Sequence, residues 1–271
     1  MSKAAIMAVL AALLAHGAPQ LAGSAWAADL LPPAPSLDSP ALRGRFAPES
    51  GPYLRADAGY GMLQTRSATS TFSAPVMGFR YEATDMGQSG LLGLGAGYRF
   101  NDYLRFDLSG EYRGSASYGA RTSHVDLASC ATRCAEAYAA SIRSGAVMAN
   151  VYGEIGSWFD VTPFVGFGAG VAQTTIAPMT IAAGNGHGAG EAPRASQVRP
   201  SFALMAGASW DLSSKIKIEA GYRYMTLGTA RSGAMACAPA TGPCAAQVQQ
   251  IGLASHDLRI GLRYGLSSDA P

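Results

Sequence analysis

Apolar and polar residues alternate along much of the chain with a period of two. In the stretch GLGAGYRFNDYLRFDLSGEYR, residues 93–113, small or charged side chains occupy one set of positions and mostly apolar side chains occupy the other. The alternation breaks at Asn101-Asp102 and then resumes. A period of two on both sides of a two-residue turn predicts a β-hairpin. It leaves open which face is buried, because apolar side chains face the core of a soluble sheet but face lipid on a membrane barrel.

Eight segments carry this alternation, each of about ten residues, the length that a tilted strand needs to cross a membrane. They begin near Tyr53, Gly90, Tyr103, Ala146, Thr162, Ser201, Ile216 and Asp257. Short connections lie at 101–102, 157–160 and 211–215, and long ones at about 65–88, 114–145, 174–197 and 227–254. Short turns at one end and long loops at the other are typical of a bacterial outer-membrane barrel, and a soluble β-sandwich has no reason to sort its loops in this way.

The N-terminal residues predict export. An apolar run over 4–15 follows Lys3 and is too short to span a bilayer, which takes about 20 apolar residues. Ala25-Trp26-Ala27 then supplies the small residues that precede a cleavage site, so we expect a signal peptide over 1–27, cut after Ala27. Beyond it we expect a proline-rich periplasmic segment over 28–51, a barrel over 52–266 and a short C-terminal tail over 267–271.

The apolar rows of the eight segments fit a lipid-facing surface. Charged residues make up 14% of the chain, yet none falls in these rows. A mid-bilayer Arg or Lys costs roughly 2–4 kcal/mol, which explains why the rows are free of charge. Aromatic residues gather at the two ends of the rows, with Tyr98, Phe100, Trp210 and Tyr264 at the periplasmic end and Tyr60, Tyr112, Tyr222 and Tyr224 at the outer end. Such girdles mark the two membrane interfaces. We therefore predict an all-β fold, an eight-stranded antiparallel up-and-down transmembrane β-barrel in the outer membrane of a Gram-negative bacterium.

The opposite rows would line the lumen, and they are rich in charge. Their charged members include Arg55, Asp57, Arg99, Arg105, Asp107, Glu111, Arg113, Glu154, Lys217, Glu219, Arg223, Asp257, Arg259 and Arg263. An eight-stranded barrel is only wide enough for side chains to fill it. Charges removed from water cost several kcal/mol each unless they are paired. We expect these residues to form a lumen charge network with a structural role.

Four cysteines lie in two of the predicted outer loops. Cys130 and Cys134 belong to CATRC, and Cys237 and Cys244 belong to CAPATGPC. An even number of cysteines in an exported protein favours disulfides. Local pairing of 130 with 134 and of 237 with 244 closes only short loops, but a bridge between the two loops stays open because sequence does not fix connectivity. Such bridges would stiffen a surface that meets a partner or protect the loops from proteolysis.

Other motifs predict no catalytic, cofactor or metal site. The glycine-rich stretches sit inside alternating strands, whereas a nucleotide-binding loop must open a helix. The histidines and cysteines lack CxxC or HxxxH spacing. Ser255, His256 and Asp257 are consecutive, and neighbours on a strand point to opposite faces, so they cannot form a hydrolase triad by themselves. The net charge is only +2, without a basic cluster interleaved with aromatics, which excludes a typical nucleic-acid surface.

Six stretches of the chain carry a family resemblance: PYLRADAGYG, GLGAGYRFNDYLRFDLSGEYR, NVYGEIGSWFDVTPFVGFGAGVA, IKIEAGYRYMTLG, HDLRIGLRYGL, and AADLLPPAP at the mature start. The resemblance is to the small alphaproteobacterial outer-membrane proteins often labelled porin-family or OmpA-like barrels. It covers about 52–266 and implies an eight-stranded barrel involved in envelope integrity and surface interaction, with no catalytic centre. Two features depart from the family. The last strand continues past Tyr264 into Gly265-Leu266 and SSDAP instead of ending in an aromatic residue, and the outer loops carry cysteines.

The sequence therefore predicts a structural and surface-interaction role. Outer-membrane lipid and lipopolysaccharide would surround the barrel, with peptidoglycan-side or host-surface partners at its ends. We expect a monomer that binds neither a cofactor nor nucleic acid. Two alternatives remain at this point, a narrow pore for small solutes and a lipid-modifying outer-membrane enzyme.

Overall fold

The computed structural model describes residues 50–72, 76–125, 133–158, 160–183, 189–237 and 247–266. The predicted signal peptide, nearly all of the proline-rich segment and the predicted tail lie outside these residues. Within the described ranges, no helix is long and apolar enough to cross a membrane.

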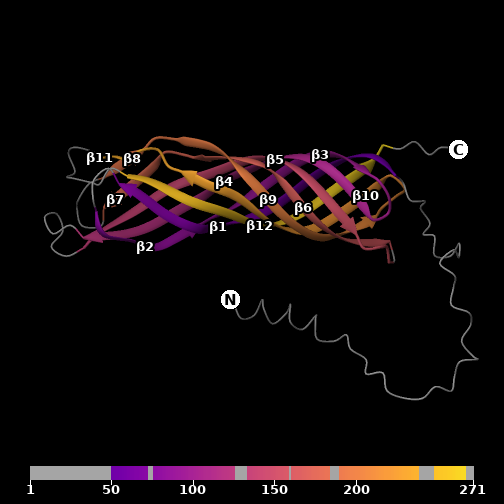
Figure 1. The fold of residues 1–271 in the computed structure, drawn as a ribbon, viewed down its shortest axis with the longest axis horizontal. Helices are drawn as coiled ribbons and strands as arrows, with labels where there is room; N and C mark the ends of the chain where they lie inside the picture. Colours follow the sequence, from indigo (N-terminus) through magenta and orange to yellow (C-terminus); the bar gives the residue numbers. More distant parts are fainter. Residues whose placement is uncertain are drawn as a thin grey trace, which may run out of the picture. The chain divides into compact units, whose positions relative to one another are not determined.

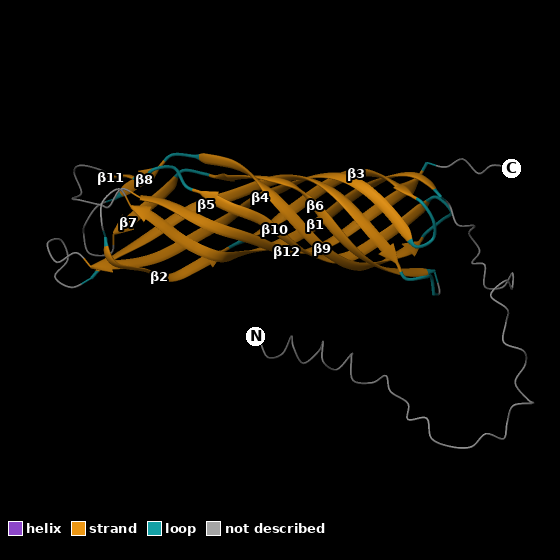
Figure 2. Cartoon of the chain, in the orientation of Figure 1, coloured by secondary structure: helices purple, strands orange, loops and turns teal. Residues whose placement is uncertain are grey.

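Eight antiparallel strands form a closed barrel (Figure 1). They are β1 Gly51–Phe72, β3 Gln88–Arg99, β4 Leu104–Val125, β5 Cys134–Glu154, β6 Val161–Ile176, β9 Ala195–Asp211, β10 Ile216–Arg231 and β12 Gln247–Gly265. Each strand pairs with the next one in this order, and the pairing of β12 with β1 closes the ring. Figure 2 shows that strands make up almost the whole of the described chain. The predicted all-β, eight-stranded up-and-down fold is confirmed.

Four shorter strands lie at the end of the barrel opposite the short turns. They are β2 Met77–Met86, β7 Met179–Ala183, β8 Gly190–Ala192 and β11 Ala236–Cys237. β2 precedes β3 along the chain and pairs with β4, while β7 pairs with β5, β8 with β7 and β11 with β8. Figure 1 shows their labels gathered toward one end of the barrel.

The two faces of the strands follow the predicted register. On the outside, Leu94 is 70% exposed and Ile260 is 65% exposed. On the inside, Asp107 and Asp257 have no exposed surface. A belt of exposed large apolar side chains around a barrel with charged residues inside is the arrangement that lipid requires.

The strands are much longer than the sequence predicted. β1 and β4 each have 22 residues and β5 has 21, compared with the ten or so that cross a membrane. Most of the predicted loops at 65–88 and 114–145 is therefore strand, and those loop predictions were wrong. We call the part of the barrel beyond the apolar belt the outer extension; it comprises 63–72, 77–87, 116–125, 134–144, 174–183, 189–199, 227–237 and 247–254.

Bulges at the base of the outer extension explain the error for β1 and β4. The pairing register shifts between Thr65 and Ser67 in β1, between Arg113 and Ala116 in β4, and between Thr226 and Gly228 in β10. An extra residue reverses the inside-outside phase of the strand that follows, so a search for an unbroken period of two stops there. At the β10 bulge the backbone needs glycine, because Gly228 has a φ of 75°.

The polarity of the two faces also inverts across the bulges. In the outer extension Ile142 is buried and its neighbour Arg143 is exposed. Further inward along the same strand, Asn150 is buried and Val151 is exposed. The exterior faces water beyond the membrane, so polar side chains point outward there and the interior becomes apolar.

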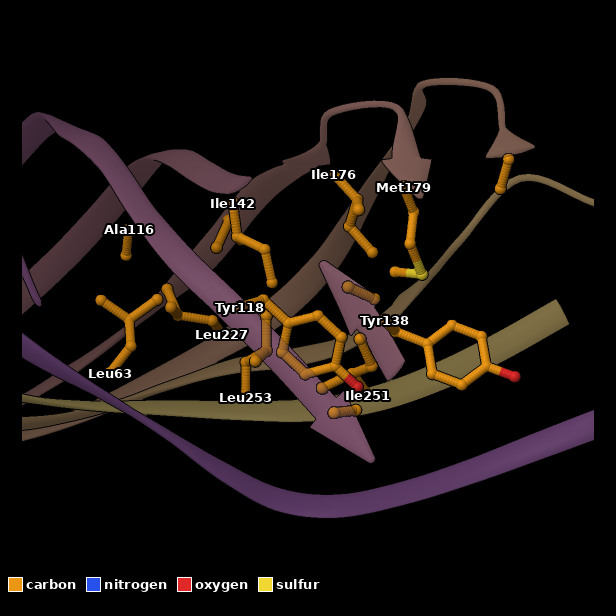
Figure 3. Close-up of a cluster of buried hydrophobic side chains, with 14 of the residues drawn as sticks. Leu63, Ala116, Tyr118, Tyr138, Ile142, Ile176, Met179, Leu227, Ile251 and Leu253 are labelled. Carbon is orange, nitrogen blue, oxygen red and sulfur yellow. The ribbon is translucent and has the colours of Figure 1, made fainter. Parts of the chain in front are cut away.

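An apolar core fills the outer extension (Figure 3). Its larger members are Leu63, Tyr118, Tyr138, Ile142, Ile176, Met179, Ile181, Met225, Leu227, Met235, Ile251 and Leu253. Burying an aliphatic side chain of this size contributes about 1.5–3 kcal/mol relative to leaving it in water. The outer extension is thus a folded domain-like cap on the membrane barrel, built from the same strands.

One seam of the outer extension lacks a backbone ladder among the described residues. Pairing between β1 and β3 ends at Met62 opposite Gln88, and β1 has no register with β2 beyond that point. Side chains join the two strands instead. The hydroxyl oxygens of Ser70 and Tyr81 lie 2.8 Å apart, and the ring centroids of Phe72 and Phe79 lie 4.7 Å apart.

Limited trypsin digestion distinguishes the outer extension from loops. Arg121 lies on a strand that is paired on both sides, and Arg66 lies on the unpaired edge of β1. A protease must bind the chain in an extended, unpaired form, so we expect Arg121 and Arg143 to resist cleavage in the folded protein. Arg66 and Arg80 should be cut first, and all four after boiling. Early cleavage at Arg121 or Arg143 in the folded protein would show that these segments are loops.

Candidate functional site: the charged lumen

The charged side chains predicted for the lumen come together inside the membrane-spanning part of the barrel. They form two groups, one toward the periplasmic end and one next to the apolar core. The periplasmic-side group contains Arg55, Asp57, Arg99, Arg105, Asp107, Glu154, Glu219, Arg259 and Arg263. The second group contains Glu111, Arg113, Arg223 and Asp257.

Glu219 on β10 is bound by arginines from three other strands. Its Oε1 lies 3.1 Å from Nη2 of Arg105 on β4 and 3.3 Å from Nη1 of Arg263 on β12. Its Oε2 lies 3.7 Å from Nη2 of Arg55 on β1. The side chain of Glu219 is only 6% exposed, so these contacts replace nearly all of its hydration. One carboxylate thereby links four strands across the lumen.

Glu154 forms a second hub nearer the periplasmic end. Its Oε1 lies 3.0 Å from Nε of Arg105 and 3.2 Å from Nη1 of Arg263, and its Oε2 lies 2.9 Å from Nη2 of Arg99. Arg105 and Arg263 are therefore shared by Glu154 and Glu219. The two carboxylates therefore belong to one continuous network.

Arg55 and Asp57 on β1 connect further charged residues to the network. Nη2 of Arg55 lies 2.7 Å from Oδ1 of Asp57, and its Nη1 lies 2.7 Å from Oδ2 of Asp107. The same Nη1 donates to the Tyr152 hydroxyl at 2.6 Å. Arg259 completes the group at 3.1 Å from Oδ2 of Asp57.

The group next to the apolar core is a compact square of two arginines and two carboxylates. Arg113 lies 2.5 Å from Asp257 and 3.1 Å from Glu111. Arg223 lies 2.8 Å from Asp257 and 2.7 Å from Glu111. The Ser255 hydroxyl adds a hydrogen bond to Asp257 Oδ1 at 2.6 Å. Paired in this way, four buried charges compensate one another.

Aromatic rings support Arg105, a contribution that sequence reasoning missed for Tyr53 and Phe164. The guanidinium carbon of Arg105 lies 3.8 Å from the ring centroid of Tyr152, 5.1 Å from that of Phe164 and 6.0 Å from that of Tyr53. A cation over an aromatic face is stabilised by the ring quadrupole. The signal was present, since all three rings occupy inward positions of the period-two pattern.

Lys217 lies apart from the two groups. Its Nζ is 2.5 Å from Oδ1 of Asp211, and both side chains are partly exposed at the periplasmic rim. Asp211 was assigned to a turn, so sequence reasoning did not identify this pair. The register of β10 with β9 places the two residues directly opposite each other.

Little space remains inside the membrane-spanning part. A small cavity that admits water is lined by Arg55, Asp57, Tyr152, Glu219 and Arg259, among others. Next to it, Arg105 has no exposed surface. Beyond the square of charges the interior is occupied by the apolar core. An ion entering from outside would have to pass an apolar layer and then a layer of paired charges.

Ser255 and His256 do not assemble into a hydrolytic site. Ser255 points inward and binds Asp257, whereas His256 lies outward with Nδ1 2.6 Å from the Tyr222 hydroxyl. Within the described ranges no group of three or more His, Cys, Asp or Glu residues is placed to hold a metal ion. Of the cysteines, Cys134 and the backbone of Cys237 are described. Cys130 and Cys244 lie outside the described residues, so both disulfide pairings remain predictions.

Comparison with known proteins identifies the family. Residues 8–264 match the family described as "Outer membrane protein beta-barrel domain". The chain belongs to this family. Uncharacterized proteins of Brucella abortus (strain 2308) and Brucella suis biovar 1 (strain 1330) are each 29% identical to it over 276 residues, which cover 89% of this chain and 92% of each relative. The predicted resemblance to small outer-membrane barrels and the predicted location in a Gram-negative outer membrane are confirmed.

Solved structures show the same fold at low sequence identity. The outer membrane protein OprG from Pseudomonas aeruginosa has a TM-score of 0.52 at 14% identity, covering 81% of this chain and 98% of that chain. Neisserial surface protein A (NspA) has a TM-score of 0.46 at 16% identity, covering 80% of this chain and 98% of that chain.

Removal of one central charge tests the role of the network. Glu219→Gln keeps the shape of the side chain but leaves Arg55, Arg105 and Arg263 with less compensation. We expect the free energy of unfolding to fall by about 3–5 kcal/mol, the usual effect of breaking a buried pair from one side. Urea titration of the protein in detergent micelles measures it.

The matched control is Glu82→Gln in the exposed pair of Arg80 and Glu82, where the carboxylate side chain is 42% exposed. Water screens an exposed ion pair, so this variant should unfold almost like the parent. If Glu219→Gln resists urea as well as Glu82→Gln does, the lumen charges do not stabilise the barrel.

Proposed function

We propose that this protein is a closed outer-membrane barrel with a structural and surface-interaction role, whose rigid outer extension is displayed at the cell surface. The filled interior is the observation that carries the proposal. Charged groups in the membrane-spanning part are paired, and the apolar core occupies the interior beyond them. A barrel filled in this way would hold the outer extension in place at the cell surface. It would not offer a path for solutes.

The outer extension has the properties of an interaction surface. Its long paired strands hold exposed side chains in fixed positions, including Arg121, Arg143 and Arg231. These arginines lie beyond the apolar belt, where the phosphates and carboxylates of an outer leaflet would be within their reach. Guanidinium groups bind such anions in a bidentate way, which supports lipopolysaccharide as a partner around the extension. Host-surface partners would bind the end of the outer extension that lies farthest from the apolar belt, and peptidoglycan-side partners would bind the periplasmic end of the barrel.

The proposal assigns no catalytic step to the barrel. The charged groups that would serve as acid or base in the lumen are committed to ion pairs, and Asp257 is held by two arginines and a serine hydroxyl. The cysteine bridges predicted from the sequence would add to the rigidity of the tip.

Electrical recording tests the closed lumen. The folded protein, verified by its faster electrophoretic migration before boiling, should give no large, steady conductance in planar bilayers. A general porin in the same bilayers serves as the positive control. Reproducible open-channel currents from the folded protein would refute the proposal and favour the pore alternative.

A further inference from the structure

The apolar core gives way at the outer end of the barrel to a buried polar group. We call it the mouth cluster, and it consists of Thr122 and His124 on β4, Glu136 and Tyr138 on β5, and Gln247 and Gln249 on β12. All six side chains are buried. The register of β4 with β5 places Thr122 opposite Glu136 and Ala120 opposite Tyr138. Three strands thus bring polar groups to the outer end of the barrel, beyond the apolar core.

Tyr138 organises the mouth cluster. Its hydroxyl donates to Oε2 of Glu136 and accepts from Nε2 of Gln247. Burial and the Glu136 carboxylate raise the pKa of Tyr138, so the phenol stays protonated and keeps donating. Figure 3 shows the rings of Tyr118 and Tyr138 among the apolar side chains of the core.

Glu136 is a buried carboxylate without a cationic partner among the described residues. Arg133 is nearby in sequence, but its Nη2 donates to the Gly78 carbonyl at 2.7 Å and to the Ser123 hydroxyl at 2.8 Å. Arg121 is exposed on the outer face. Glu136 is therefore buried without an ion-pair partner among the residues that the structure describes.

Other buried atoms of the mouth cluster have no hydrogen-bond partner. They are Oε1 of Gln247, Oγ1 of Thr122, Nδ1 of His124 and Nε2 of Gln249. Gln247 is 2% exposed and Thr122 is 1% exposed, so water does not reach them freely. Buried polar atoms in proteins are nearly always paired, so a group of unpaired ones beside a carboxylate with no ion-pair partner among the described residues requires an explanation, and a bound ligand is one that would supply the missing partners.

We propose that the mouth cluster binds a small organic cation, a primary ammonium group on an alkyl chain. An ammonium group has three donors, and the Glu136 carboxylate, Oε1 of Gln247 and the Thr122 hydroxyl are acceptors. The alkyl chain would contact the ring of Tyr138 and the apolar side chains below it. An anion would be repelled by Glu136, and a neutral ligand would leave its charge unbalanced. The site adds a ligand to the proposed closed barrel and does not depend on the state of the lumen.

Calorimetric titration of the folded, full-length protein in detergent micelles tests the site. The probes are n-butylammonium, 1-butanol and butyrate, which share a four-carbon chain and differ in charge. We expect n-butylammonium to bind at least tenfold more tightly than either of the others. Glu136→Gln should lower its affinity at least tenfold. The matched control is Glu191→Gln, an exposed carboxylate on β8 at the same end of the barrel, which should leave the affinity unchanged.

A second variant keeps the test decisive if Glu136→Gln fails to fold. Tyr138→Phe retains the carboxylate but loses the hydroxyl that orients it, so affinity for n-butylammonium should fall while the preference for the cation over 1-butanol remains. A short glycine-serine peptide with one central lysine distinguishes a side chain of a partner from a free amine, because it carries the same ammonium-butyl group. Equal binding of 1-butanol, no binding of either ammonium probe, or equal affinity in the Glu136→Gln and Glu191→Gln variants would overturn the proposal.

Discussion

Pairing of every charge inside a narrow barrel is the constraint on which the rest of the structure depends. Eight strands leave a space that side chains fill, so an unpaired charge there has neither water nor a counterion. Arg105 illustrates the solution, because it contacts Glu154, Glu219 and the face of Tyr152 at once. Such contacts join strands across the lumen, while backbone ladders join them around it. The closed lumen that we propose would result from the same contacts that join the strands.

The same strands have lipid on their outer face in one part and water on it in another part. In the membrane the exterior must be apolar, and charge is confined to the inside. Beyond the membrane the exterior is in water, and the inside becomes an apolar core, as Ile142 and Arg143 show in comparison with Asn150 and Val151. The bulges in β1, β4 and β10 lie between these two regions and reset the phase of the side chains. The result is one continuous wall that encloses charged side chains in the membrane-spanning part and apolar side chains in the outer extension.

The sequence predicted the parts that depend on local periodicity. The inward and outward rows follow from the period of two, and so the barrel, its lipid-facing belt and the identity of the lumen charges were accessible. The length of β4 was not, because the bulge at 113–116 breaks its period. The length of β5 was not, because the polarity of its two faces inverts although its period of two continues. Individual partners such as Glu219 and Arg105 depend on the tilt and stagger of the whole barrel. The mouth cluster was missed because it combines residues of β4, β5 and β12 that share no local motif.

A double-mutant cycle on Arg113 and Asp257, whose charged atoms lie 2.5 Å apart, tests the central claim most directly. Urea unfolding is measured for the parent, Arg113→Met, Asp257→Asn and the double variant. If paired charges stabilise the barrel, each single variant loses about 3–5 kcal/mol of its free energy of unfolding. The double variant loses less than the sum of the two single losses, by about 0.5–3 kcal/mol, because neither member of the pair is left charged without the other. Strictly additive losses, or single variants as stable as the parent, would contradict the account.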